Sequence, residues 1–536
     1  MPVIYKIYKK MELRSVLLST LIIVALLVNA NIANKVGMLD TLPGWQIDAI
    51  PAALSSQIYG HPSNYTQLKV VKNTFYENLK STHIQDVDRA IHAAMSLTLE
   101  KKNSDYSLLG TDDKGVIHFV ELSFKIFGFS AISLYKMYFC LVALSIIGLL
   151  IVYWRVYPVF LVILSIILVH ALLLTSVALN PQLTSILALR VMPVAGIIAS
   201  FHLILATISP RTSWKAAFIM ILQATIVLLL VHIRFSAIWE VLAVCLALMV
   251  VFIKLSSRSH IRVCVYDAIF MIAPTVILLG GFFVMQALER QSMAVEYARG
   301  EQIVGHVFWH SLFSGLALEP FLSKELQIKL DDVSVIAATG KYLINNGRRN
   351  DWIKLGGTSE SFSKIQYAAY DLAVRDMWFD VCFKNLGYCL KAMIWDKPNA
   401  LMWNIAWLTG ITSHIPTPDK LDTTVYNQLS SVKEQLEAQF NQQNTLLYYL
   451  DLFLIMIAMS ISRISKEHND STILLSTAIL LIGSLLPSLL AYPIPHAIAE
   501  PTILSIVFVV LLSFKLLSSI TAFQIRRMHI INDREQ

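Results

Sequence analysis

Charged residues are scarce in this sequence. Lysine, arginine, aspartate and glutamate make up only 15% of the 536 residues, whereas soluble domains contain roughly 25%. Hydrophobic residues account for 56%, and many stand in runs long enough to cross roughly 30 Å of hydrocarbon as helices. The net charge of +7 gives no indication of nucleic-acid binding, because basic residues in membrane proteins usually mark cytoplasmic loops. The composition predicts a polytopic transmembrane protein.

Motifs that bind nucleotides or metals are missing as well. No GxxxxGK[ST] phosphate-binding loop occurs, and no GxGxxG follows a predicted strand. Asp86 and Asp88 have the DxD spacing of sugar-nucleotide enzymes, but they lie in an amphipathic stretch, where a solvated helix face explains them better. His306 and His310 are one helical turn apart, yet neither the glutamate of HExxH nor a third ligand is evident. We therefore expect no cofactor, although the pattern leaves a divalent metal open.

Ten apolar segments are predicted to span the membrane. Basic residues, among them Arg155, Lys254 and Arg463, occur at every second boundary between these segments. The positive-inside rule therefore places both termini in the cytoplasm. The first segment also resembles a cleavable signal peptide, with a basic start and small residues near its end, but we expect it to remain as an anchor. The ten predicted spans are about 14–34, 133–154, 156–177, 187–208, 214–233, 235–254, 266–288, 446–463, 471–492 and 498–519.

This topology leaves two large segments outside the cytoplasm. In the first, Ile84, Val87 and Ile91 recur at helical spacing, which indicates an amphipathic helix that could lie on the membrane surface. A second such pattern includes Phe119 and Phe124. No alternating strand pattern is present, so the predicted fold is all-α. The predicted regions are an N-terminal anchor at 1–34, an extracytoplasmic loop at 35–132, a transmembrane bundle at 133–288, an extracytoplasmic helical domain at 289–445, and C-terminal transmembrane helices with a cytoplasmic tail at 446–536.

Cysteine is also sparse, with five residues in the chain. Only Cys382 and Cys389 are expected to face an oxidising compartment. If both stand on one helix, seven residues at 1.5 Å each separate them by roughly 10 Å, which is too far for a disulfide. We therefore interpret them as two small apolar residues on a helix face.

Polar residues collect near the predicted outer face of the membrane. Charged groups at this depth are costly and often functional. A pair of carboxylates facing several cations would suit proton abstraction beside a bound phosphate. The predicted catalytic residues are Asp112 and Asp113, and the predicted substrate-binding residues are Lys114, Arg190, Arg234, His306, His310 and His496.

Each of these residues also has a purely structural interpretation. Asp112 could cap a helix that starts near Asp113, whose carboxylate would favour the helix dipole. Arg190 and Arg234 could anchor helix ends by reaching to the interface. His310 could be a packing histidine. Taken singly, each residue fits the structural interpretation, and only their collection at one face favours a site.

The layout and three short stretches resemble the GT-C glycosyltransferases, which use polyprenyl-phosphate-linked sugars. The layout combines an N-in first helix, a long outer loop with surface helices and an acidic motif shortly before the second span. The stretches are GTDDKG at 110–115, FGFS at 127–130 and HVFWHSLFSGL at 306–316, and they are similar to bacterial polytopic proteins of this kind. The resemblance implies that Asp112 or Asp113 is the catalytic base and that Arg190 and Arg234 hold the donor phosphate.

The expected function is therefore transfer of a sugar from a polyprenyl-phosphate carrier to an extracytoplasmic glycan, lipid or protein. Alternatives are an O-antigen ligase or polymerase and a non-catalytic GT-C-like subunit of an envelope complex. A transporter is disfavoured, because charge within the spans is limited to residues such as Glu240 and Asp451 and broken helices are not evident. The expected partners are the lipid-linked sugar and the membrane, without nucleic acid, and the expected location is a bacterial inner membrane.

Overall fold

The chain is described by a computed structural model in which helices dominate. A short antiparallel pair of strands, β1 (Thr66–Leu68) and β2 (Tyr106–Leu108), is the exception that the sequence pattern did not predict. The structure describes residues 2–35, 40, 42, 44–59, 66–97, 106–108, 115–177, 192–234, 237–256, 265–292, 308–330, 332–355, 367–401, 470–490 and 499–516.

Nine of the ten predicted spans fall on helices, and the tenth, 446–463, lies outside the described residues. Within the part of the chain that is described, seven helices are long and apolar enough to cross a membrane. Two further apolar helices, Pro193–Ile208 and Ser471–Leu486, are shorter. The bundle consists of α1 (Pro2–Lys35), α6 (Ile132–Tyr153), α7 (Tyr157–Val177), α9 (Pro193–Ile208), α10 (Trp214–Ile233), α11 (Ile238–Ser256), α12 (Val265–Ser292), α23 (Asp470–Leu490) and the helix Ala499–Leu516.

The short helix α9 lies at the centre of the bundle. It packs against six other bundle helices, and every residue from Pro193 to Thr207 is buried. Sixteen residues span only about 24 Å, less than the hydrocarbon thickness of roughly 30 Å. Because its neighbours separate α9 from lipid, this helix does not need the full length. The predicted span at 187–208 was longer than the described helix, and its first residues lie outside the described part.

Polar side chains also join the helices of the bundle. Asn29 on α1 donates a hydrogen bond to the carbonyl oxygen of Ile167 at 3.1 Å and contacts Nδ1 of His170 at 2.9 Å. Gln223 on α10 donates to the carbonyl oxygen of Ser145 on α6 at 2.8 Å. Interhelical hydrogen bonds of this kind stabilise membrane bundles by about 0.6 kcal/mol on average.

The segment between α1 and α6 folds into four helices that pack together. The amphipathic pattern predicted there is helical, but Val87 and Ile91 on α4 pack against α2 and α3 and not against a membrane surface. Asp88 accepts hydrogen bonds from Ser130 and from the backbone N–H of Ala131, at 3.1 and 2.6 Å, so it fixes the start of α6. The four helices are α2 (Gly44–Tyr59), α3 (Lys69–Asn78), α4 (Ile84–Met95) and α5 (Gly115–Phe127).

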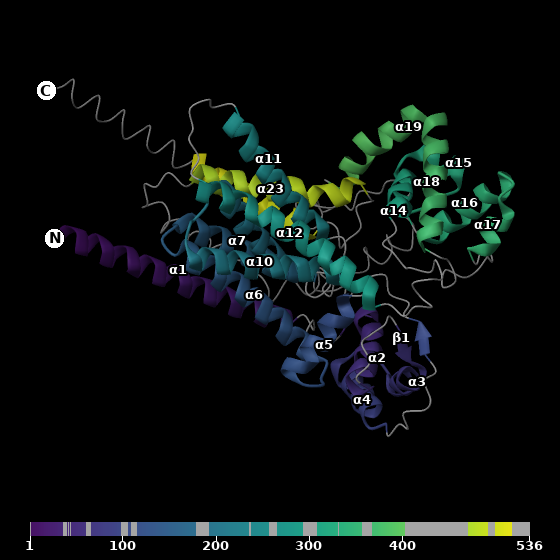
Figure 1. Cartoon of the computed structure of the whole chain (residues 1–536), viewed down its shortest axis with the longest axis horizontal. Helices are drawn as coiled ribbons and strands as arrows, with labels where there is room; N and C mark the ends of the chain where they lie inside the picture. Colours follow the sequence, from purple (N-terminus) through teal and green to yellow (C-terminus); the bar gives the residue numbers. More distant parts are fainter. Residues whose placement is uncertain are drawn as a thin grey trace.

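A second group of helices, which we call the inserted domain (residues 308–397), has its own hydrophobic core. Figure 1 places the inserted domain and helices α2–α4 beyond the same end of the bundle, where α1 ends. We call this the loop-side end. The helices of the inserted domain are α14 (Phe308–Ser314), η3 (Gly315–Leu318), α15 (Pro320–Leu326), α16 (Asp332–Asn345), α17 (Arg349–Lys354), α18 (Tyr367–Lys384), α19 (Leu386–Lys391) and the π-helical turn η5 (Ala392–Asp396).

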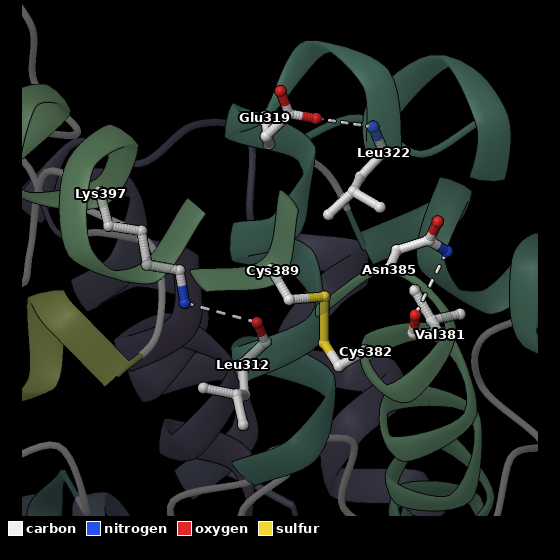
Figure 2. The surroundings of a disulfide bond; sticks show 8 residues. All are labelled: Leu312, Glu319, Leu322, Val381, Cys382, Asn385, Cys389 and Lys397. Atoms are coloured by element: carbon white, nitrogen blue, oxygen red, sulfur yellow. Dashed lines mark hydrogen bonds between the residues drawn. A yellow bond between two sulfur atoms is a disulfide. The ribbon is translucent and has the colours of Figure 1, made fainter. Parts of the chain in front are cut away.

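A disulfide joins Cys382 on α18 to Cys389 on α19, contrary to the sequence prediction (Figure 2). That prediction was wrong because it assumed one continuous helix. The helix instead breaks at Asn385, whose backbone φ of −125° leaves the helical range. The break brings the two Cα atoms to 5.5 Å, which lies within the usual range for a disulfide.

Candidate functional site

The loop-side end of the bundle is held together by a close backbone contact between α5 and α10. Gly115, the first residue of α5, packs directly on the last turn of α10. A Cβ atom at this position would lie 2.1 Å from the carbonyl oxygen of His232 and 2.6 Å from its ring. In addition, the rings of His118 and His232 stack with centroids 5.3 Å apart and an interplanar angle of 20°. Only glycine allows the two backbones to approach this closely.

This contact requires glycine at position 115. We expect Gly115→Ala to lower the unfolding midpoint of the detergent-solubilised protein, because the new methyl group overlaps the α10 backbone and α5 must shift. Overpacking of this kind typically costs about 1–3 kcal/mol. Gly280→Ala is the matched control, because nothing lies within 4 Å of a Cβ at Gly280. Equal midpoints for the two variants would show that the contact is not close.

Arg234 ends α10 in the turn that leads to α11. Its backbone N–H donates to Leu230 at 2.8 Å, and its carbonyl oxygen accepts from the N–H of Ala237 at 2.9 Å. The residue is half-buried, so its guanidinium group is not simply extended into water. As the sequence predicted, a short turn between two spans holds this arginine at the bundle end.

Two buried carboxyl groups lie near the same end, in the first turns of their helices. Glu240 on α11 is 1% exposed and Glu500 is 3% exposed, and the two groups are close enough to interact electrostatically. Ser200 on α9 donates a hydrogen bond to Oε2 of Glu240 at 3.2 Å. Gly196 makes room for the other carboxylate oxygen, since a Cβ there would lie 2.1 Å from it. Buried ionisable groups inside membranes usually mark functional positions.

The sequence prediction placed Glu500 among the polar residues near the outer face, but it named neither glutamate as a site residue. Glu240 lies six residues after Arg234, and Glu500 lies four residues after His496. This closeness to predicted site residues was a usable signal. Their proximity depends on how the two helices are placed in the bundle, and this placement cannot be read from spacing. The sequence analysis also missed His118, which stacks on His232 and lies 3.5 Å from Glu121.

Most of the predicted site residues lie outside the described part of the chain. Of the eight, the structure describes two, Arg234 and His310, and they lie in different units, the bundle end and the inserted domain. The six outside the described residues are Asp112, Asp113, Lys114, Arg190, His306 and His496.

His310 is buried in the inserted domain, and both of its ring nitrogens are engaged. Nδ1 lies 2.8 Å from the hydroxyl of Tyr370 and Nε2 lies 2.9 Å from Asp332. Its backbone N–H donates to Asp371 at 2.9 Å. The hydrogen bond from His310 lowers the pKa of Asp332 below its usual value. This geometry fits the packing histidine considered as the structural interpretation.

Other places in the described structure offer less chemistry. An apolar groove of about 680 Å³ between α11 and α12 is lined by residues such as Leu248 and Phe252, which suits acyl chains more than a polar reaction. No group of three His, Cys, Asp or Glu side chains among the described residues is placed to hold a metal ion.

Comparisons with known proteins do not assign the chain to a family. No protein-family model matches it, and no curated protein or solved structure is significantly similar to it. The resemblance to GT-C glycosyltransferases therefore stays a prediction from the short motifs. The structure adds the close contact between α5 and α10 beside Arg234.

Proposed function

We propose that this chain is a membrane transferase that moves a sugar from a polyprenyl-phosphate carrier to an acceptor outside the cytoplasm. The observation that supports this most directly is the contact of Gly115 with His232. Gly115 directly follows Lys114 in the chain, and His232 stands two residues before Arg234. The acidic motif and the predicted phosphate ligand are therefore close in the chain to two residues that are in contact.

The chemistry follows from these residue types. Asp112 or Asp113 would take the proton of the acceptor hydroxyl, whose oxygen then forms a bond to the anomeric carbon of the sugar. The bond from that carbon to the phosphate oxygen breaks, and the phosphate leaves with the electron pair. Arg234, helped by Arg190, would stabilise the negative charge that develops on the leaving phosphate. Arginine suits this role because its planar fork can bind two phosphate oxygens at once.

The disulfide supports the orientation that this proposal needs. Disulfides persist in oxidising compartments and are rare in the cytosol. A bridge between Cys382 and Cys389 therefore favours an extracytoplasmic inserted domain. This argument is independent of the basic residues from which the sequence predicts an N-in topology.

We expect Arg234→Lys to weaken use of a polyprenyl-phosphate sugar by about tenfold or more, because one charge-assisted hydrogen bond contributes about 1.5–3 kcal/mol. The measurement is a donor titration with purified protein. Arg211→Lys is the matched control, because Arg211 lies just before α10, at the opposite end of that helix, and stacks over Tyr153 at 5.8 Å. If the Arg234 variant and the parent have the same donor affinity and turnover, Arg234 does not bind the phosphate.

A further inference from the structure

The inserted domain exposes a row of large apolar side chains along the end of α18, α19 and η5. Singly exposed apolar residues are common on soluble domains, but a contiguous group indicates a binding surface. Here five of them lie within thirteen residues, so this segment, 383–395, needs a partner. The exposed fractions are 78% for Phe383, 57% for Leu386, 48% for Leu390, 68% for Ile394 and 64% for Trp395.

The opposite side of the same segment is apolar too. Cys389 and Ala392 are buried in the core of the inserted domain, and Met393 packs against that core. When one face of a helix packs on a core and another exposes large apolar side chains, the exposed face is normally covered by protein or by lipid. Among the described residues, cover is found on only one side of this segment.

Two lysines lie among the exposed apolar residues of this segment. Lys384, Lys391 and Tyr388 line a hollow of about 370 Å³. Lys391 is held by Glu319 at 3.0 Å and by Asp396 at 3.6 Å, which leaves Lys384 to face an anion. The only acidic residue in or directly after the segment is Asp396, and it is paired. The exposed side therefore combines apolar and aromatic groups with positive charge.

We propose that segment 383–395 lies in the interface of the membrane that the chain itself crosses, with its apolar row among the upper acyl chains and Lys384 beside the lipid phosphates. Aromatic residues with flanking lysines are typical of membrane interfaces. The short connection between α12 and α14 also favours lipid as the partner of this surface. Only fifteen residues, 293–307, separate α12 from α14, so the inserted domain begins within about 55 Å of a membrane helix.

This surface is independent of the proposed transferase activity. It concerns how the inserted domain is held at the membrane, whatever reaction the loop-side end supports. Its test therefore uses no substrate, and its failure leaves the transferase proposal in place.

The test is the depth of an environment-sensitive probe in lipid nanodiscs. Cys140, Cys245 and Cys264 are replaced by Ser, and the Cys382–Cys389 bridge is kept. An NBD fluorophore is then attached to Ile394→Cys or, as a second site, to Leu386→Cys. The matched control is Ile353→Cys on α17, which is 59% exposed in the same domain. The nanodiscs contain phosphatidylethanolamine and phosphatidylglycerol, with or without bromine atoms on the upper acyl chains.

We expect blue-shifted emission at both segment positions and a loss of intensity with brominated lipid, while the probe at position 353 keeps the emission of a water-exposed group. Water-like emission at positions 386 and 394 would overturn the proposal. So would a blue shift without quenching by bromine, because the row would then be covered by protein, such as a second copy of the chain. Equal quenching at position 353 would also contradict it, since contact would not be confined to this segment.

Discussion

Asp113→Asn is expected to reduce sugar transfer by about 10²–10⁴-fold, the usual effect of losing a general base. An amide keeps the size of the side chain and its ability to accept a hydrogen bond, but it cannot take a proton from the acceptor hydroxyl. The measurement is the initial rate of a purified protein with a polyprenyl-phosphate sugar. Asp112→Asn is measured in parallel, because the resemblance does not decide between the two carboxylates.

The control for this prediction is another aspartate of the same segment between α1 and α6. Asp86 accepts a hydrogen bond from Ser81 at 2.5 Å and pairs with Arg89 at 3.1 Å. Asp86→Asn should therefore affect stability and leave turnover unchanged. If Asp112→Asn and Asp113→Asn behave in the same way as this control, the acidic pair only caps a helix, which contributes about 1 kcal/mol.

Lys397→Met is expected to stabilise the inserted domain by several kcal/mol at neutral pH. Lys397 is fully buried, and Nζ lies 3.5 Å from the carbonyl oxygen of Leu312 (Figure 2). Burial lowers the pKa of Lys397 from 10.5 to about 7. A difference of this size corresponds to about 5 kcal/mol at 1.36 kcal/mol per pH unit. This figure is an upper limit, because a methionine also has to fit the site.

The same burial predicts a pH dependence with a definite sign. Between pH 7 and about 10 the unfolded chain holds a proton on Lys397 that the folded chain has released. The free energy of unfolding therefore rises with pH across this window. Lys397→Met should remove that rise, whereas Lys324→Met, at an exposed position of the same domain, should keep it. Denaturant titrations at several pH values measure both effects, and an unchanged slope in Lys397→Met would refute the assignment.

The spans were predictable because lipid imposes a simple requirement. A chain in hydrocarbon must satisfy its backbone within a long apolar helix, so α6 and α7 lie within a residue of the predicted limits, at 132–153 and 157–177. The central helix α9 begins later than predicted, because a helix surrounded by protein is released from that requirement. Which helices contact one another was not predictable from the sequence. The amphipathic pattern of α4 therefore suggested a membrane surface, whereas the helix packs on α3.

The site was predictable only in part, and for a related reason. Sequence position indicates which polar residues stand near span ends, and in this way it found Arg234. It cannot indicate that Ser200 on α9 donates a hydrogen bond to Glu240 on α11, or that Gly115 allows α5 to contact α10. The helix break at Asn385 did have a local signal, since Asn385 and Gly387 are turn-forming residues, but their apolar neighbours favoured one continuous helix.

The disulfide also restrains the direction in which the chain runs after α18. A continuous helix would hold Cys382 and Cys389 roughly 10 Å apart, whereas the break at Asn385 brings their Cα atoms to 5.5 Å. The corner at Asn385 is therefore tied to the oxidation state of two thiols. Reduction would remove the covalent restraint that holds Ile394 and Trp395 in this direction. The chemistry of the compartment thus helps to set the shape of the domain.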